Sequence, residues 1–418
     1  MGAEYACAAR AGWWLARGLA VVLGVSVLAG SVAAARPSVV TQEQLAQLQL
    51  PPGFRVNVFA EGLGYVRMLA FTPRGELVAA SSSRSVAGTD CNGGACVPND
   101  GRVFLLRDAN GDGVADRNEV LLDGLDRANG VAYYNGALYV SVWGQVLRVP
   151  ERGGVLDPAG VEVVVPDLPV GPSHWSRTIA FGPDGKMYVH AGSSCNVCEE
   201  SDPRRATVMQ FNPDGSAGRI FARGLRNAVG LAFHPTTGEL WVSNNQRDLM
   251  GDDFPPEYVS VVRDGDHFGW PFCHVGVPDP DYGYLGSCDI VRAPSVLLPA
   301  HSAPLGIAFY TGQQFRAEYH GDLFVAMHGS WNRSYPQGYK VVRIPLASGV
   351  PGPVSDFATG WLPADPTCVN RPSDALRSEP ICRADAWGRP VALAVGPEGA
   401  LYLSDDLAGV VYRITYAP

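Results

Sequence analysis

An oxygen-rich loop lies between two apolar segments of the sequence. From Asp108 to Glu119, oxygen-bearing side chains occupy the first, third, fifth, ninth and twelfth positions, and Gly113 occupies the sixth. This is the ligand spacing of a calcium-binding loop, in which the glycine permits a sharp turn around the ion. The flanking segments are typical of strands, so we predict a structural Ca²⁺ site between two strands, with a solvated acidic turn as the alternative. The predicted ligands are Asp108, Asn110, Asp112, Asp116 and Glu119.

Four short polar clusters have the residue types needed to bind an anion and to accept a proton. Arginine presents planar donors that suit carboxylates, and histidine is the side chain best suited to act as a general base near neutral pH. Each cluster alone is more often structural, but together they indicate an anion site with a general base beside it. The clusters are 171–177 with His174, the pair Arg226 and Asn227, 328–333 with His328 and Arg333, and 387–390 with Arg389.

Several other classes of function are disfavoured. The sequence contains no dinucleotide-binding fingerprint, no P-loop and no nucleophile-elbow motif. A net charge of −9 gives no basic face for nucleic acid. Glu199 follows Cys198 where covalent haem attachment would require histidine, so we expect any electrons to leave to a separate carrier, such as a quinone, a cytochrome or a dye.

The elements that must position these clusters are indicated by a phrase that recurs six times. Each copy has an alanine between two apolar or aromatic residues, then a turn, then a short alternating strand. This is the pattern of a β-hairpin. Consecutive alanines are 48 residues (Ala132 to Ala180) to 86 residues (Ala308 to Ala394) apart, which suits one blade and its loops. The copies begin at Leu69, Val131, Ile179, Leu231, Ile307 and Leu393.

This repeat predicts an all-β fold, a six-bladed β-propeller of four-stranded antiparallel blades around a central channel. One blade cannot bury both of its faces, so six copies imply a closed ring. We expect the repeat aromatics Phe71, Phe181, Phe233 and Tyr402 to pack in the core. The polar clusters hold matching positions relative to the repeats, and we expect them to open on one mouth of the channel.

The N-terminus has the order of a secretory signal. Arg10 and Arg17 precede the apolar segment 19–28, and 33–35 offers small residues for cleavage. That apolar segment is shorter than a spanning helix needs, although an uncleaved membrane anchor is the alternative. We therefore predict a signal peptide over 1–35, a propeller domain over 36–418 and a periplasmic or secreted protein.

Cysteine usage also favours export. Removal of the signal takes Cys7 and leaves eight cysteines that fall as close neighbours, an even count typical of disulfides in an oxidising compartment. We interpret 195–198 as a structural bridge, with a redox C-x-x-C as the alternative. The neighbours are Cys91 and Cys96, Cys195 and Cys198, Cys273 and Cys288, and Cys368 and Cys382.

Nearly the whole mature chain resembles the soluble dehydrogenases of sugars and aldehydes that carry pyrroloquinoline quinone (PQQ), most closely the sorbosone-dehydrogenase-like branch. The resemblance includes His174 ahead of the third repeat and runs from about Leu50 to Ile414. The other shared segments are Gly224-Leu225-Arg226-Asn227, Phe268-Gly269-Trp270-Pro271 and Gly388-Arg389-Pro390-Val391.

The resemblance implies a cationic site for PQQ, which bears three carboxylates. Arg389 matches a family arginine, and Arg226 with Asn227 matches a family Arg-Asn pair. Lys340 lies one residue from the family lysine, and Arg333 is the alternative source of that charge. The neighbouring His328 is assigned to the cofactor with them.

The resemblance also implies a catalytic base and a second Ca²⁺, beside PQQ. His174 matches the base, which takes the substrate hydroxyl proton during hydride transfer. The calcium would be held by two adjacent backbone carbonyls, at about Arg247 and Asp248, where the glucose enzymes have Gly-Pro instead. Their supporting aspartate falls here near Ser193, which argues against glucose as the substrate.

The predicted function is thus oxidation of a sugar or sugar-derived aldehyde. Two other classes stay open: a Ca²⁺-dependent lactonase on a six-bladed propeller, and a non-catalytic propeller that serves as a binding module. The lactonase would need carboxylates that line the channel, whereas the clusters here are mainly His, Arg, Asn and Trp.

The calcium loop gives a first prediction. An ion bound only by the folded state stabilises it, by about 2.7 kcal/mol when the free ion is at a hundred times its dissociation constant. Chelation should therefore lower the melting temperature of the protein. Asp112→Ala should remove most of the chelator-induced shift that is due to this loop. A melting curve that responds to neither chelator nor mutation contradicts the prediction.

Overall fold

The computed structural model describes residues 40–83, 97–346, 349–366, 368–370 and 382–417. These residues form six small antiparallel sheets arranged as a six-bladed propeller, which confirms the predicted fold. The predicted signal peptide and the pair Cys91 and Cys96 lie outside the described residues, as do the side chains of Cys368 and Cys382. No helix in the described ranges is long and apolar enough to span a bilayer.

The first three blades follow one another along the chain. Blade 1 contains β2 (Tyr65–Phe71), β3 (Leu77–Ser82), β4 (Gly101–Arg107) and β5 (Arg117–Leu125). Blade 2 contains β6 (Val131–Tyr134), β7 (Ala137–Val142), β8 (Gln145–Arg152) and β10 (Glu162–Val165), with β9 (Val155–Leu156) beside β8. Blade 3 contains β11 (Ile179–Phe181), β12 (Met187–Ala191), β13 (Thr207–Phe211) and β14 (Arg219–Arg223).

The last three blades include the closure of the ring. Blade 4 contains β15 (Leu231–Phe233), β16 (Leu240–Asn244), β17 (Glu257–Val262) and β20 (Val296–Leu298). Blade 5 contains β21 (Pro304–Phe309), β22 (Leu323–Met327), β23 (Lys340–Ile344) and β24 (Ser355–Ala358). Blade 6 contains β27 (Pro390–Val395), β28 (Leu401–Asp405), β29 (Val410–Tyr416) and β1 (Phe54–Ala60).

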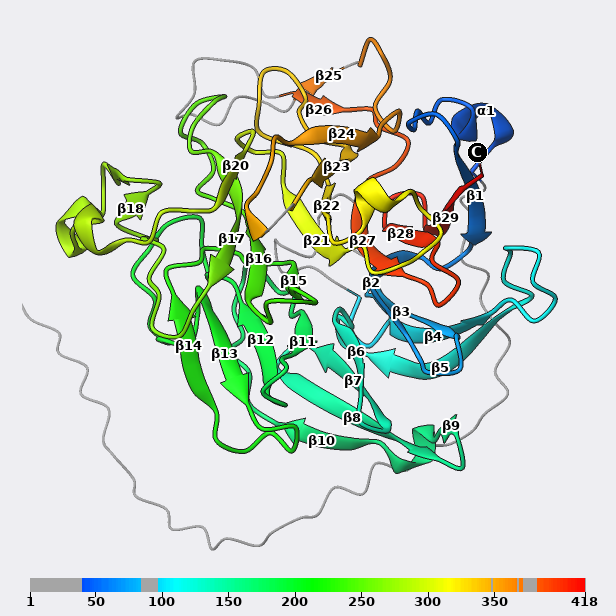
Figure 1. Ribbon diagram of the computed structural model, residues 1–418. Helices are drawn as coiled ribbons and strands as arrows, with labels where there is room; N and C mark the ends of the chain where they lie inside the picture. Colours follow the sequence, from blue (N-terminus) through cyan, green and yellow to red (C-terminus); the bar gives the residue numbers. More distant parts are fainter. Residues whose placement is uncertain (1–39, 84–96, 347–348, 367, 371–381, 418) are drawn as a thin grey trace, which may run out of the picture. The chain divides into compact units, whose positions relative to one another are not determined.

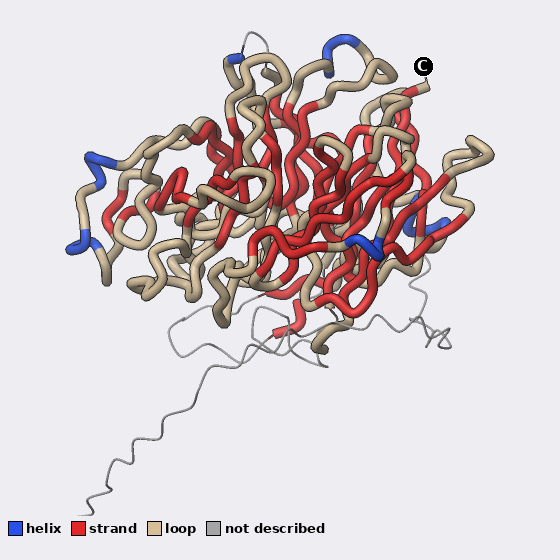
Figure 2. The backbone as a smooth tube through the Cα atoms, turned by 90° about the horizontal axis from the view of Figure 1, so that it is seen from below, coloured by secondary structure: helices blue, strands red, loops and turns tan. Residues whose placement is uncertain are grey.

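Short elements decorate these blades. Two small hairpins pair β18 (Cys273–His274) with β19 (Val277–Pro278), and β25 (Cys368–Asn370) with β26 (Cys382–Ala384). The helical turns are α1 (Gln42–Leu45), η2 (Pro158–Gly160), η3 (Gly283–Leu285), η4 (Cys288–Ile290) and η5 (Ala317–Tyr319). They lie at the edges of the strand-rich body (Figure 2).

Every copy of the sequence repeat forms the first two strands of one blade. The first strands contact one another around the ring in the order β2, β6, β11, β15, β21, β27 and back to β2. Figure 1 shows these six strands around the centre. The first strands of the six repeats therefore form the innermost ring of the propeller.

The repeat aromatics pack between blades, which confirms their assignment to the core. Phe181 of blade 3 stacks on Tyr134 of blade 2, with ring centroids 4.1 Å apart and planes at 3°. Phe71 of blade 1 meets Tyr402 of blade 6 edge-on at 5.1 Å, and Phe233 meets Tyr188 in the same way. Each blade thus covers the aromatic face that its neighbour leaves open.

A serine in the second strand of alternate blades fastens neighbouring inner strands together. In blade 4, the hydroxyl of Ser243 accepts from the N–H of Gly230 (2.8 Å) and donates to the carbonyl of Leu305 in blade 5. Ser141 in blade 2 and Ser404 in blade 6 make the same pair of bonds to their own and the next blade. A Cβ at Gly230 would lie 2.2 Å from the Leu305 carbonyl, so glycine permits this close approach.

The ring closes through the first strand of the described chain. β1 pairs antiparallel with β29, so that Phe54 lies opposite Tyr416 in one sheet. The acidic loop between β4 and β5 also contacts β1, because Asn57 Nδ2 donates to the carbonyl of Gly113 (2.8 Å) and the N–H of Ala115 donates to the carbonyl of Phe59 (2.7 Å). Blades 1 and 6 are thereby joined at the closure.

The serine bridges give a second prediction. Ser243→Ala leaves a buried N–H and a buried carbonyl without their partner, which costs about 1–3 kcal/mol of unfolding free energy. The control Ser355→Ala alters an exposed hydroxyl on β24 and should stay within about 0.5 kcal/mol. Urea unfolding of both variants measures the difference, and equal midpoints would contradict the proposed role of the serine.

Candidate functional site

The antiparallel order of the strands decides which loops share a mouth of the channel. Connections from the second to the third strand, and from the fourth strand to the next blade, all open at the same end. The four predicted polar clusters lie in such connections or directly beside them: between blades 2 and 3, between blades 3 and 4, within blade 5, and ahead of the first strand of blade 6. The acidic loop 108–116 joins a third strand to a fourth and therefore lies at the opposite end.

His174 lies in the connection to blade 3, with a left-handed backbone (φ 45°). Its Nδ1 is 2.9 Å from both the carbonyl and the hydroxyl oxygen of Ser193. A carbonyl can only accept, so Nδ1 carries the proton and Nε2 keeps a lone pair. Burial, followed by the charge of Arg226, holds the pKa of His174 well below its usual value, so the ring is neutral at pH 7.

Two buried arginines hold the segment that carries His174. Arg177 donates to the carbonyls of His174 (2.7 Å) and Ser176 (2.6 Å), and Arg205 donates to the carbonyls of Ser173 (2.7 Å) and Ser193 (2.6 Å). Burial lowers the pKa of Arg177 to about 9. Within the described residues neither guanidinium forms an ion pair, and both keep a buried Nε–H without a partner. Burial lowers the pKa of Arg205, and the charges of Glu200 and Asp202 oppose that shift, so the less compensated positive charge beside His174 is that of Arg177.

Arg226 joins blades 3 and 4. It donates from Nε to the carbonyl of Asn196 (2.9 Å) and from Nη2 to the Asn196 side chain (2.9 Å). The same Nη2 forms an ion pair with Asp248 (2.6 Å), whose other oxygen accepts from Asn332 of blade 5 (2.8 Å). The guanidinium is only 3% exposed, so these bonds fix its position.

Asn227 lies against His174 across a glycine. A Cβ at Gly192 would lie 2.5 Å from Asn227 Oδ1 and 2.6 Å from the Cβ of His174, so only glycine allows the two side chains to meet there. Asn227 Oδ1 is buried and has no hydrogen-bond partner among the described residues. A buried acceptor without a partner is rare in proteins and is a common mark of a ligand site.

A second histidine is held by a carboxylate. His328 Nε2 is 2.8 Å from Asp406 Oδ1, and Arg67 donates to Asp406 Oδ2 (2.6 Å). Burial alone would raise the pKa of Asp406, but His328 and Arg67 together hold it below its usual value. Burial, then the charge of Arg389, lowers the pKa of His328 to about 4. His328 is therefore a neutral imidazole that donates from Nε2 to an ionised carboxylate.

Arg389 lies beside His328. Its Nε and Nη2 donate to the carbonyls of His328 (3.0 Å) and Gly329 (2.6 Å), and its guanidinium faces the ring of Tyr339 at 5.5 Å. Its own N–H donates to the buried carboxylate of Asp405 (2.8 Å). The backbone and the side chain of Arg389 are thus both positioned by blades 5 and 6.

These contacts form one connected set, which we call the mouth network. Asn129 completes it, because its side chain accepts from Arg67 (3.3 Å) and donates to the carbonyl of Arg177 (2.8 Å). All six blades contribute. Its members are Arg67, Asn129, His174, Arg177, Ser193, Asn196, Arg205, Arg226, Asn227, Asp248, His328, Asn332, Arg389 and Asp406.

Three other predicted site residues have partners outside the mouth network. Lys340 forms an ion pair with Asp356 of the outer strand β24 (2.6 Å). Arg333 pairs with Asp253 (3.0 Å). The Arg247 side chain pairs with Asp281 (2.7 Å) and Asp279, although the prediction for Arg247 concerns its backbone carbonyl.

The predicted calcium loop is already hydrogen-bonded within itself. Asp108 accepts from the N–H groups of Gly111 (2.7 Å) and Gly113 (2.8 Å), and Asp116 accepts from the N–H of Ala109 (2.6 Å). Glu119 pairs with Arg107 (2.7 Å). In the described part of the chain the carboxylates of this loop do not converge as a group of metal ligands, and calcium binding there stays a prediction.

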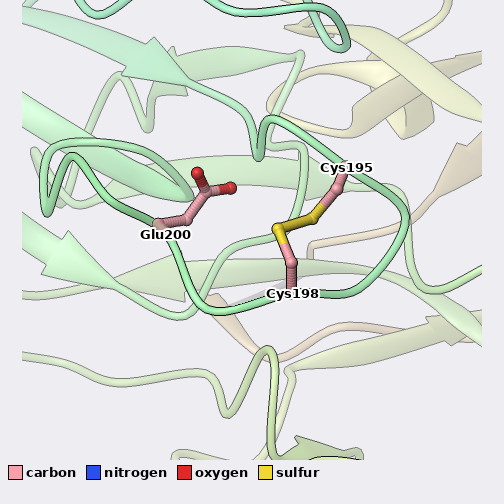
Figure 3. A group of neighbouring side chains, drawn as sticks. All are labelled: Cys195, Cys198 and Glu200. Atoms are coloured by element: carbon pink, nitrogen blue, oxygen red, sulfur yellow. A yellow bond between two sulfur atoms is a disulfide. The ribbon is translucent and has the colours of Figure 1, made fainter. Parts of the chain in front are cut away.

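Both described disulfides join cysteines that are close neighbours in sequence. Cys195 bonds Cys198, and Cys273 bonds Cys288, so the interpretation of 195–198 as a bridge is confirmed. Among the described residues, one group of metal-ligating side chains comes together, Cys195, Cys198 and Glu200 (Figure 3). Its two sulfurs are bonded to each other, so they are not free to bind a metal while the bridge is intact.

Sequence reasoning missed several members of the mouth network. Arg67, Asn129, Arg205, Asn196 and Asp406 were not among the predicted site residues. Position could have found two of them, because Asn129 precedes an inner strand and Asp406 follows a second strand, as the predicted clusters do. The contacts of the others depend on the fold, and no local pattern marks them.

Known proteins resemble this chain. Family models match 40–328 (the domain of unknown function DUF7133) and 286–417 (TrAA12-like). An uncharacterized protein from Borreliella burgdorferi is 34% identical over 239 residues, 56% of this chain. A pyrroloquinoline quinone-dependent pyranose dehydrogenase from Coprinopsis cinerea is 27% identical over 299 residues, 58% of this chain. The chain spans only 58% and 39% of the length of these two relatives.

The fold matches as well. The holo form of the PQQ domain of pyranose dehydrogenase from Coprinopsis cinerea superposes with a TM-score of 0.67 at 22% identity, over 88% of this chain and 97% of that one. The first of the family models covers more than half of the sequence. The chain therefore belongs to the family described as domain of unknown function DUF7133, and it resembles the PQQ-dependent sugar dehydrogenases, as its sequence indicated.

Proposed function

We propose that this chain is an exported PQQ-dependent dehydrogenase that oxidises a sugar or a sugar-derived aldehyde, of the aldose or sorbosone class. The observation that carries the proposal is the mouth network, in which a neutral histidine lies among arginines that outnumber its carboxylates. The PQQ-dependent relatives support it. The two disulfides support export, since such bridges persist in oxidising compartments.

The residues present fit an anionic cofactor. Arg177 has no ion-pair partner in the described part of the chain and no carboxylate that offsets its lowered pKa, so bound carboxylates would supply a missing counter-charge. Arg226 and Arg389 would orient those carboxylates, and Asn227 Oδ1 would accept from a polar group of the ligand. Bound there, PQQ would supply the two-electron acceptor for the substrate.

His174 is proposed as the base that takes the proton of the substrate hydroxyl. Its Nδ1–H is held by Ser193, which leaves the Nε2 lone pair for the proton. Arg226, Arg205 and Arg177 all lower its pKa. An anion bound beside these arginines offsets their charge and raises the pKa of His174 towards its usual range, where it is a better base.

Calcium is proposed at the carbonyls of Arg247 and Asp248. The Asp248 carbonyl accepts from Asn196 Nδ2 (3.1 Å), and a carbonyl oxygen keeps a second lone pair for an ion. A second Ca²⁺ is proposed in the loop with Asp108, Asn110, Asp112, Asp116 and Glu119. Electrons would leave to a separate acceptor, a quinone, a cytochrome or a dye.

A lactonase is less well supported. It would need carboxylates that converge on an ion, and each of the two carboxylates of the mouth network is paired with an arginine, Asp248 with Arg226 and Asp406 with Arg67. A non-catalytic propeller remains the outcome to expect if PQQ does not bind.

The central prediction separates cofactor binding from turnover. With PQQ and Ca²⁺, we expect the protein to reduce an artificial dye with a member of a panel of aldoses, sorbosone and simple aldehydes. His174→Ala should leave PQQ binding nearly intact and cut turnover by about 10²–10⁴-fold. Arg389→Ala should weaken PQQ binding by about 1.5–3 kcal/mol, because a charge-assisted contact is lost. Absorbance titration and dye reduction measure the two effects.

Matched controls come from the connection between β21 and β22 of blade 5. His320→Ala and Arg316→Ala remove an exposed histidine and an exposed arginine and should change neither quantity. A larger loss of turnover in His328→Ala than in His174→Ala would assign the base to the histidine held by Asp406. Failure of PQQ to bind at high micromolar concentration with Ca²⁺ present rejects the dehydrogenase and favours the non-catalytic propeller.

The pKa of His328 gives a prediction for stability. An unfolded histidine binds a proton below about pH 6.5, whereas folded His328 does so only near pH 4, so the unfolded state gains protons first on acidification. The contribution of His328 to stability is present above pH 6.5 and is lost as the pH falls towards 4. His328→Gln should reduce the loss of unfolding free energy between pH 7 and pH 5 by about 2 kcal/mol, measured by urea unfolding. An unchanged loss would show that His328 titrates normally.

A further inference from the structure

Asn196, which lies between the two half-cystines of the Cys195–Cys198 bridge, connects three separate segments at the mouth. Its carbonyl accepts from Arg226 Nε (2.9 Å) and from the indole N–H of Trp270 (3.2 Å). Its side-chain oxygen accepts from Arg226 Nη2 (2.9 Å) and from the N–H of Asp248 (2.8 Å). Its Nδ2 donates to the carbonyl of Asp248 (3.1 Å).

The side-chain amide of Asn196 therefore bonds both backbone polar groups of Asp248, as a neighbouring strand would. The side-chain oxygen of Asn196 also accepts from Arg226 Nη2, while its backbone carbonyl accepts from Arg226 Nε. Arg226 and Asp248 form an ion pair with each other (2.6 Å), so Asn196 fixes both members of one buried pair. No other described residue bonds the side chain of Arg226 and the backbone of Asp248 together.

The disulfide restricts the backbone on both sides of Asn196. Cys195 and Cys198 close a loop of four residues, and the carbonyl of Cys195 accepts from the hydroxyl of Ser193 (2.6 Å). Ser193 in turn holds the His174 ring. The loop between the two cysteines thus reaches both the proposed base and the proposed anion-binding arginine (Figure 3 shows the bridge).

We propose that Asn196 is a positioning residue for the cofactor site, and that the Cys195–Cys198 bridge is what holds it in place. The identity of the ligand in this inference rests on the proposed function. The positioning role itself rests on the contacts of Asn196 described above. The bridge acts through Arg226 and Asp248 and touches no reacting atom. Its role is thus local order at the mouth, more than stability of the whole fold.

The other described disulfide provides a matched control. Cys273 and Cys288, in the insertion of blade 4, have a sequence separation of 15, against 3 for Cys195 and Cys198. A bridge that closes a longer loop removes more freedom from the unfolded chain and stabilises the fold more. When each cysteine pair is changed to serine, we therefore expect loss of Cys195–Cys198 to act mainly on PQQ affinity and loss of Cys273–Cys288 to act mainly on melting temperature.

The experiment uses the whole exported chain and three variants: Asn196→Ala, Cys195→Ser with Cys198→Ser, and Cys273→Ser with Cys288→Ser. PQQ affinity is measured by absorbance titration with Ca²⁺. Loss of a supporting contact of this kind typically weakens a site by about 10- to 100-fold. We expect that loss in the first two variants with a small change in melting temperature. The third should melt at a lower temperature than either and lose less PQQ affinity than either.

Hydrogen exchange of the apo protein tests the geometry without PQQ. Peptides over 245–250 should exchange faster in both variants. In Asn196→Ala the N–H of Asp248 loses its acceptor, and in the Cys195/Cys198 variant that acceptor becomes mobile. Peptides from β16 should stay protected in both. If the wild-type chain binds no PQQ but this exchange pattern appears, the proposed function fails and the positioning role stands. Wild-type exchange and wild-type PQQ affinity in both variants overturn the inference.

Discussion

The hydrogen bonds that cross from blade to blade at the channel mouth are the constraint on which the site depends. The members of the mouth network are divided among all six blades, and no single blade holds enough of them to bind a ligand alone. Because Asp406 binds groups from blades 5 and 1, and Asp248 binds groups from blades 3 and 5, the site is complete only when the ring is closed. The fold and the site are therefore established together.

The charges at the mouth would favour an anion at the proposed site. A buried guanidinium without a carboxylate partner is costly, and Arg177 bears that cost while it holds the His174 segment by backbone carbonyls alone. Ser193 fits this arrangement. It orients the imidazole without adding a negative charge that would neutralise the arginines. Orientation and basicity are thus controlled by different groups.

The blades and the shared position of the polar clusters could be predicted from sequence, because both follow from short local patterns. The repeated hairpin and its turn fix the blades, and the antiparallel order of strands then places the clusters around His174, Arg226, His328 and Arg389 at one mouth. The partners of those residues could not be predicted in the same way. Arg67 and Asp406 are 339 positions apart and pair only after closure. For the same reason nothing local indicated that Lys340 would turn towards Asp356 on the outer strand.

Closure by β1 sets an order of events during synthesis. Among the described strands β1 is made first, but its partner β29 is made last. At about 5–20 residues per second, some tens of seconds pass before the two can pair. Over that time β1 is an unpaired edge, open to pairing with other chains. Its contacts with the acidic loop, which is made much earlier, give this strand a first place to dock while the remaining blades are still emerging.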